Sequence, residues 1–229
     1  MARESSTSRE PGARPAVEAE DPLTDADRLD ELAAGDDARV RAAVAAHPNS
    51  RPRTLQALAE DDDRRVRAAV ASHDAVDSDV LDDLAFDEEW TVRLAAAGNP
   101  SVGEYSLTEL LRDDDVRVRE VAARSRGLSL DDMERAAKDD DGRVRAAVAA
   151  NDGAPEDVLS RLSADATWQV RAGVGGNPAS ALVLLRTLAT DEDWRVRAAV
   201  AANPATPEEV LAALALDGDE GVREASRRQ

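Results

Sequence analysis

Several residue types are absent or rare in this 229-residue sequence. It contains no Cys and no Ile, one Phe, one Tyr and a single Lys, Lys138. The lack of Cys excludes disulfide bridges, Cys-ligated zinc, iron–sulfur clusters and a thiol nucleophile. No apolar run approaches the roughly 18 residues that a membrane helix needs, so no membrane partner is expected. Residues 1–20 hold no apolar segment of the secretory type, and we therefore expect a cytoplasmic protein.

Large apolar side chains are scarce, whereas acidic side chains are abundant. Leu, Val and Phe together number 45, Ala alone numbers 46, and 48 acidic against 29 basic residues give a net charge of −19. This composition by itself is typical of a disordered chain. The acidic balance also argues against nucleic acid as the main partner, because nucleic-acid-binding proteins normally present a basic face. The high Ala and Arg content is typical of a bacterial protein from a GC-rich genome.

The order of the residues changes this interpretation, because the dipeptide Val-Arg recurs every 26 residues without insertion or deletion. The eight copies begin at Val40, Val66, Val92, Val118, Val144, Val170, Val196 and Val222. An Asp stands five residues before every Val after the first, and Leu or Met recurs at a fixed place between copies. A fixed period of this length is the signature of a repeat array.

Each repeat is expected to form two short helices. The first begins near Thr206-Pro207, with Thr206 as the N-cap and Glu209 completing a capping box. The second begins after an acidic cluster that ends at Asp193, and its inward stripe ends at Asn203. Helices of about ten residues do not persist alone, so each must pack on neighbouring copies. The pattern predicts an all-α solenoid of eight 26-residue two-helix repeats without β-sheet, as a single domain over residues 23–229, after a disordered tail over residues 1–22.

The repeat unit resembles the leucine-rich repeat variant family, a relative of HEAT-like repeats in bacterial proteins. The resemblance rests on the unit V-R-A-A-V-A-x-N-P-x-x-P-x-E-V-L-x-x-L-A-x-D-x-x-x-x-V-R and covers about Thr24 to Arg228. It implies a right-handed superhelix of paired short helices. Some members of that family carry a Cys-ligated iron–sulfur cluster ahead of the repeats, which this Cys-free sequence cannot hold.

Arg and Asp form two recurring columns that we interpret as a structural ladder. The Arg of every Val-Arg pair is expected to bind a repeat Asp, within or between units, because residues identical in every copy are more simply structural than partner-specific. The columns are Arg41, Arg67, Arg93, Arg119, Arg145, Arg171, Arg197 and Arg223, with Asp61, Asp87, Asp113, Asp139, Asp165, Asp191 and Asp217. The sharper alternative is that the Arg row binds phosphate or nucleic acid.

The three Trp residues share one column, two residues before the Val, and they are the candidate binding residues. Helical geometry points this column away from the core, beside the Arg of the ladder and the small residue at position +5. The predicted protein-binding site is Trp90, Trp168 and Trp194 with Arg93, Arg171 and Arg197, over Gly175. The alternative is that each Trp covers the adjacent helix joint or stacks on its Arg.

The sequence offers little for catalysis or metal binding. His47 and His73 both occupy the Asn column at the end of a second helix, and we interpret them as caps rather than metal ligands. No nucleophile–base pair and no phosphate-binding loop is visible. We therefore expect no catalytic residue, no metal and no cofactor.

Three functions remain open at this stage. The first is a monomeric, non-catalytic scaffold that binds another protein, possibly one with a basic surface, on the second-helix face. The second is a HEAT-like nucleic-acid-binding or base-modifying protein that uses the Arg row. The third is an accessory or chaperone subunit of an enzyme complex, steered by the acidic edge.

Overall fold

The computed structural model describes residues 13–228, which form short α-helices of seven to nine residues and no strand. Contacts between Cα atoms divide the chain into two compact units that meet in sequence between Gly103 and Glu104. Unit 1 contains α1 (Ala13–Glu20), α2 (Ala26–Ala33), α3 (Ala38–Ala45), α4 (Pro52–Leu58), α5 (Arg64–Ala71), α6 (Ser78–Leu84) and α7 (Trp90–Gly98). Unit 2 contains α8 (Glu104–Leu110), α9 (Val116–Ala123), α10 (Leu130–Ala136), α11 (Gly142–Ala149), α12 (Glu156–Leu162), α13 (Trp168–Gly176), α14 (Leu182–Leu188), α15 (Trp194–Ala202), α16 (Glu208–Leu214) and α17 (Glu220–Arg227).

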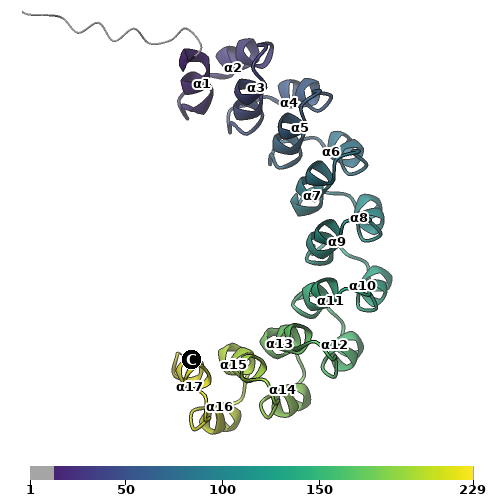
Figure 1. Cartoon of the computed structure of the whole chain (residues 1–229), viewed down its shortest axis with the longest axis vertical. Helices are drawn as coiled ribbons and strands as arrows, with labels where there is room; N and C mark the ends of the chain where they lie inside the picture. The colour runs from purple at the N-terminus through teal and green to yellow at the C-terminus, as the bar shows by residue number, and fades with distance from the viewer. Residues whose placement is uncertain (1–12, 229) are drawn as a thin grey trace, which may run out of the picture. The chain divides into compact units, whose positions relative to one another are not determined.

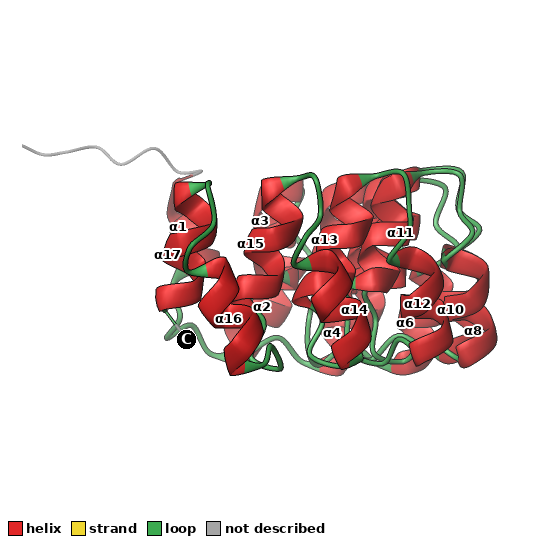
Figure 2. Cartoon of the chain, turned by 90° about the horizontal axis from the view of Figure 1, so that it is seen from below, coloured by secondary structure: helices red, strands yellow, loops and turns green. Residues whose placement is uncertain are grey.

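Within each unit the helices form two rows, which confirms the predicted α-solenoid (Figure 1). The second helices of consecutive repeats, which are the odd-numbered ones from α3 onward, pack directly side by side. The first helices, which have even numbers, form the other row and pack on the second helices before and after them (Figures 1 and 2). Each short helix is therefore stabilised by burial against its neighbours rather than by its own hydrogen bonds.

The core lies between the two rows and is built from the repeated Val and Leu columns. In α15, Val196 and Val200 are fully buried, and Leu185 and Leu188 of α14 are buried against that row. Leu211, which occupies the recurring Leu or Met position, is only half-buried, whereas Leu214 in the same helix, α16, is buried. The few large apolar residues of the chain are therefore concentrated at one seam, which explains how this composition supports an ordered fold.

Acidic side chains begin most of the second helices, as their spacing predicts. The N-cap Asp193 accepts a hydrogen bond from the Arg195 N–H at 2.9 Å, and Asp37, Asp63, Asp115, Asp141 and Asp219 cap their helices in the same way. The predicted capping box of Thr206 and Glu209 at the start of α16 is wrong. Thr206 is buried and donates its hydroxyl to the Val200 carbonyl at 2.6 Å, so it closes the end of α15, while Pro207 stands at the N-cap position of α16.

Order begins earlier than the predicted tail boundary at residue 22. Helix α1 packs beside α3 in the place of a preceding second helix, and its Ala19 is buried. The backbone that follows α1 also mimics a repeat, because the Asp21 carbonyl lies 2.9 Å from Nε2 of His47. Residues 13–22 therefore belong to the ordered array of unit 1. The remainder of the predicted tail, residues 1–12, lies outside the described residues.

Candidate binding surface

The Arg side chains of the Val-Arg pairs join consecutive repeats through bidentate ion pairs. In unit 2, Nε and Nη2 of Arg171 donate to the two carboxylate oxygens of Asp191 at 2.7 and 3.0 Å. Its Nη1 donates to the backbone carbonyl of Asp165 at 2.9 Å. The same arrangement joins Arg41 to Asp61 and Arg67 to Asp87 in unit 1, and Arg119 to Asp139, Arg145 to Asp165 and Arg197 to Asp217 in unit 2. These Arg and Asp residues of the predicted ladder are therefore in direct contact between consecutive repeats.

These pairs are largely shielded from solvent and hold the Asp carboxylates in their charged form. The Arg171 and Asp191 side chains are only 12% and 9% exposed. Hydrogen bonds from Arg197 lower the pKa of Asp217, and those from Arg145 lower the pKa of Asp165. Because both forks of each guanidinium are occupied, these Arg side chains are not presented to a phosphate or to a partner.

Arg93 and Arg223 of the ladder also contact the backbone of the loop before their own helix. Nη1 of Arg93 donates to the carbonyls of Asp87 and Glu88 in unit 1. Nη1 of Arg223 donates to the carbonyls of Asp217 and Gly218 in unit 2. Both side chains are therefore anchored on the loop that precedes their own helix, and Asp113 accepts from the Asp115 N–H at 2.8 Å.

The three residues of the acidic cluster before α15 make different contacts. In the cluster of α15, Asp191 binds Arg171 and accepts from the Asp193 N–H, and Asp193 caps the helix. The middle residue, Glu192, is 91% exposed and lies 3.7 Å from Nη2 of Arg171. Asp140 is the exposed middle residue of another cluster. In the cluster before α15, two of the three carboxylates therefore stabilise the fold, and the middle one remains at the surface.

A buried polar column at the ends of the second helices explains the Asn and His positions. Nδ2 of Asn177 donates to the carbonyls of Ala149 and Asn151 at 2.8 and 2.9 Å, and its Oδ1 accepts from the Ala179 N–H. His73 does the same work in unit 1, because Nδ1 accepts from the Ala75 N–H and Nε2 lies 3.0 Å from the His47 carbonyl. This pattern assigns the proton to Nε2. Both ring nitrogens of His73 are engaged, and residues 13–228 contain no cluster of three or more His or acidic groups suited to a metal.

Trp168 and Trp194 lie at the start of their helices, and each ring contacts a residue of the next repeat. The guanidinium carbon of Arg195 lies 3.7 Å from the ring centroid of Trp168, which is half-buried. Trp194 is 45% exposed, and its ring lies against Gly221 of α17. Trp90 is half-buried at the start of α7 in unit 1. Trp168 therefore follows the alternative interpretation, in which the ring stacks on an Arg, whereas Trp194 stays largely open.

Two parts of the predicted binding site are wrong. Gly175 is buried, and a Cβ at that position would lie 3.0 Å from Cγ2 of Val200, so no partner can reach it. Arg171 and Arg197 turn away from the Trp rings toward Asp191 and Asp217. The helical-wheel argument failed because it assumed one buried face, whereas each second helix is covered by second helices on both sides as well as by the first helices.

A second row of Arg residues, which was not predicted from the sequence, stands one position before the Val in five of the eight repeats. Their side chains bind the N-cap Asp of the same helix, as in Arg143–Asp141 at 3.0 Å and Arg195–Asp193 at 2.7 Å. Arg39, Arg65 and Arg117 form the same pair. The Asp-x-Arg spacing at helix starts was the available signal. Hydrogen bonds from Arg195 lower the pKa of Asp193 to about 2.

In unit 2, uncharged residues occupy the positions opposite the core on three consecutive second helices. We call these positions the Trp face and define it as Gly142 and Ala146 of α11 with its C-cap Ala150, Trp168, Ala172 and Gly176 of α13, and Trp194, Ala198 and Ala202 of α15. Residues four apart share one helix face, and none of these nine is buried. Charged residues border it on both sides, with Glu120 of α9 and its C-cap Arg124 on one side and Glu220 and Glu224 of α17 on the other.

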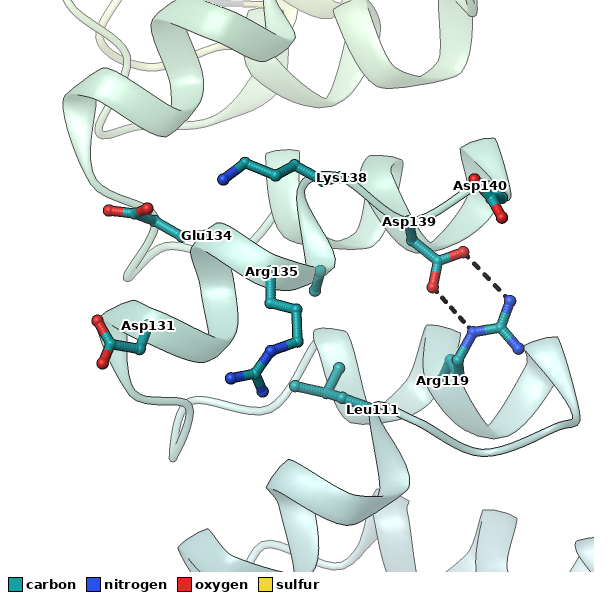
Figure 3. A pocket seen from close by; sticks show the side chains of 9 residues that line it. Leu111, Arg119, Asp131, Glu134, Arg135, Lys138, Asp139 and Asp140 are labelled. Atoms are coloured by element: carbon teal, nitrogen blue, oxygen red, sulfur yellow. Dashed lines mark hydrogen bonds and ion pairs between the residues drawn. The ribbon is translucent and has the colours of Figure 1, made fainter.

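An open depression of about 710 Å³ lies in the other row of unit 2, beside α10. Figure 3 shows Arg119 bound to Asp139 on one side of it, while Arg135 extends toward Leu111. Asp131, Glu134 and Lys138 extend in different directions and do not converge on a common point (Figure 3). The depression therefore lacks the convergent polar groups of a small-molecule site.

Comparisons with known proteins identify the repeat. A family model described as leucine rich repeat variant matches residues 194–219, and one described as leucine rich repeat variant domain matches residues 13–74. A solved leucine-rich repeat variant with a novel repetitive structural motif is 27% identical, with a TM-score of 0.60 over 91% of this chain and 86% of that one. The YibA protein of Escherichia coli is 15% identical, with a TM-score of 0.50 over the full length of both chains, and shows likeness of fold alone. No curated protein matches this sequence. None of the helices in the described part of the chain has the length and apolar character that a membrane crossing requires.

Proposed function

Because the chain belongs to the leucine-rich repeat variant family, we propose that it is a non-catalytic binding scaffold and that a partner protein docks on the Trp face of unit 2. The observation that carries this proposal is the exposed ring of Trp194 beside an uncharged surface of Gly and Ala. A large aromatic side chain over small residues is typical of the central anchor of a protein interface. The Trp column also varies between repeats, whereas the Arg and Asp columns are fixed by the fold.

Replacement of both anchors tests this proposal. Trp168→Ala with Trp194→Ala is expected to weaken capture of the partner from a lysate of the source cells at least tenfold, because interface Trp residues commonly contribute 2 kcal/mol or more. The matched control is Leu182→Ser with Val183→Ser, which changes two exposed apolar residues of α14 in the other row. Equal capture by the Trp variant and the wild type, with far-UV circular dichroism unchanged, would show that the site is elsewhere.

Use of the Arg row for nucleic acid receives no support from the geometry. A phosphate oxygen can bind a guanidinium only at an open edge. In the Arg–Asp pairs of the ladder, such as Arg145–Asp165, the Asp carboxylate occupies that edge. We therefore expect no mobility shift of a DNA or RNA duplex at low salt. A salt-sensitive shift would revive this alternative.

The accessory-subunit alternative keeps one supporting observation, the exposed middle residues of the acidic clusters. Asp140 and Glu192 take no part in capping, so they are free to attract a basic partner over a distance. Asp140→Lys tests this role without disturbing the ladder, whereas reversal at Asp139 or Asp141 would break the pair to Arg119 or the cap of α11, and reversal at Glu192 would place a cation beside Arg171. A slower association with an unchanged dissociation rate is the result expected for electrostatic steering.

A further inference from the structure

The start of each second helix contains a recurring site for a guanidinium group. In five repeats the N-cap Asp binds the Arg that stands two residues later. In α15, Nε of Arg195 donates to Oδ1 of Asp193 at 2.9 Å and Nη2 donates to Oδ2 at 2.7 Å. The same guanidinium lies 3.7 Å above the ring of Trp168 from the preceding repeat. An aromatic floor and a carboxylate wall thus hold one Arg between consecutive repeats.

The next repeat keeps the floor and the wall but lacks the Arg. Trp194 occupies the position of Trp168, Asp219 occupies the position of Asp193, and Gly221 replaces Arg195. Oδ1 of Asp219 accepts from the Gly221 and Val222 N–H groups at 2.8 and 3.4 Å, so the carboxylate is fixed by the cap. Within residues 13–228 no Arg or Lys pairs with Asp219.

The missing side chain leaves the Trp ring accessible. A Cβ on residue 221 would lie 3.1 Å from Cζ3 of Trp194, which shows that the ring lies directly over that backbone. Trp194 is the more open of the two rings of the Trp face, at 45% exposure. Glu220, in the Trp column of the next repeat, is exposed and adds a second negative charge at this end of the face.

We propose that the Trp194–Asp219 site binds the guanidinium of an arginine from the partner protein. The bound group would take the place that Arg195 takes on Trp168, with its plane stacked on the indole and its N–H groups directed at Asp219. Arginine fits better than lysine, because a planar fork can stack and bind a carboxylate at the same time. This inference rests on the proposed docking on the Trp face and specifies the partner as a segment that carries a basic residue among apolar ones.

The chain supplies its own blocking variant. Gly221→Arg places an Arg where five other repeats already have one, so the fold is expected to accept it after a small movement of the Trp194 ring. The new side chain would fill the site from within. Gly221→Ser is the matched control, because it adds a Cβ at the same point without a cation.

The test is a titration of the full chain with acetyl-arginine-amide, followed by the NMR signals of the three indole N–H groups. Each signal is assigned with a Trp→Phe variant. The Trp194 signal is expected to shift saturably, with a dissociation constant on the order of millimolar, because one cation–π contact and one exposed ion pair are weak. The Trp168 signal serves as an internal control, since Arg195 already covers that ring. Acetyl-lysine-amide is expected to bind several-fold more weakly.

Three results together support the proposal, namely a selective shift of Trp194, its loss in Gly221→Arg and its persistence in Gly221→Ser. An equal response of Trp168 and Trp194, or an unchanged response of Gly221→Arg, would overturn it. The proposed function is tested by a different result: it is refuted if the double Trp→Ala variant still captures the partner. Capture that needs Trp194 but tolerates Gly221→Arg would retain the docking face and refute the arginine site.

Discussion

Removal of one carboxamide from the buried Asn column should destabilise unit 2 strongly. Asn177 makes three hydrogen bonds, to the carbonyls of Ala149 and Asn151 and from the Ala179 N–H. In Asn177→Ala, the Asn151 carbonyl keeps a backbone partner, but the Ala149 carbonyl and the Ala179 N–H lose theirs. Ala179 is exposed, so water can replace the bond to its N–H, whereas the buried Ala149 carbonyl stays unsatisfied, and we expect a loss of about 1–3 kcal/mol.

Urea unfolding followed by circular dichroism measures this loss, with amide hydrogen exchange to locate it. Asn177→His is expected to lose about half as much, because His73 keeps the N–H acceptor and one carbonyl contact at the equivalent place. Asp140→Ala, at an exposed residue, should change the free energy of unfolding by less than about 0.5 kcal/mol. If Asn177→Ala unfolds within that same margin of the wild type, the column does not hold the repeats together.

Further predictions concern backbone packing, the ladder and acid stability. Gly176→Ala should stabilise α13 by up to about 1 kcal/mol, because its Cβ would meet only Ala199 at 3.9 Å. Gly173→Ala should destabilise α13, because its Cβ would lie 2.9 Å from the Cβ of Ala149. Thermal melts are expected to show a higher midpoint for the first variant and a lower midpoint for the second. Arg171→Lys should lower the urea midpoint, since an ammonium cannot bind Asp191 bidentately, and a midpoint equal to wild type would contradict this. The pKa of the Asp193 carboxyl is lowered to about 2, so the stability that this charged carboxylate adds is complete above about pH 4 and disappears as the pH falls toward 2. A free energy of unfolding that increases as the pH falls from 4 to 2 would contradict this prediction.

The sequence predicted the repeat architecture well because its period, capping residues and apolar columns all follow from local rules. Val196 and Val200 are buried where the helical pattern places them, and Asp193 caps the helix that it precedes. These features depend on spacing within one repeat. The period of 26 residues then fixes every copy at once.

The candidate site was harder to predict because it depends on contacts between repeats. Whether Trp168 meets an Arg and Trp194 a Gly is decided by the residue 27 positions later, which a single-helix argument does not consider. Gly175 was misplaced for the same reason, since it faces the neighbouring α15. A comparison of each column with the following repeat, rather than with its own, would have found both.

The central claim, that a partner docks on the Trp face of unit 2, is tested most directly by site-specific photo-crosslinking. A photoreactive amino acid at position 198, one helical turn after Trp194 on α15, is compared with the same group at position 183, which is 65% exposed on α14 of the other row. We expect position 198 to crosslink to one partner protein, and we expect this crosslink to be lost in the double Trp→Ala variant. Position 183 is expected to give no crosslink. The same partner crosslinked from position 183 and not from position 198 would contradict it.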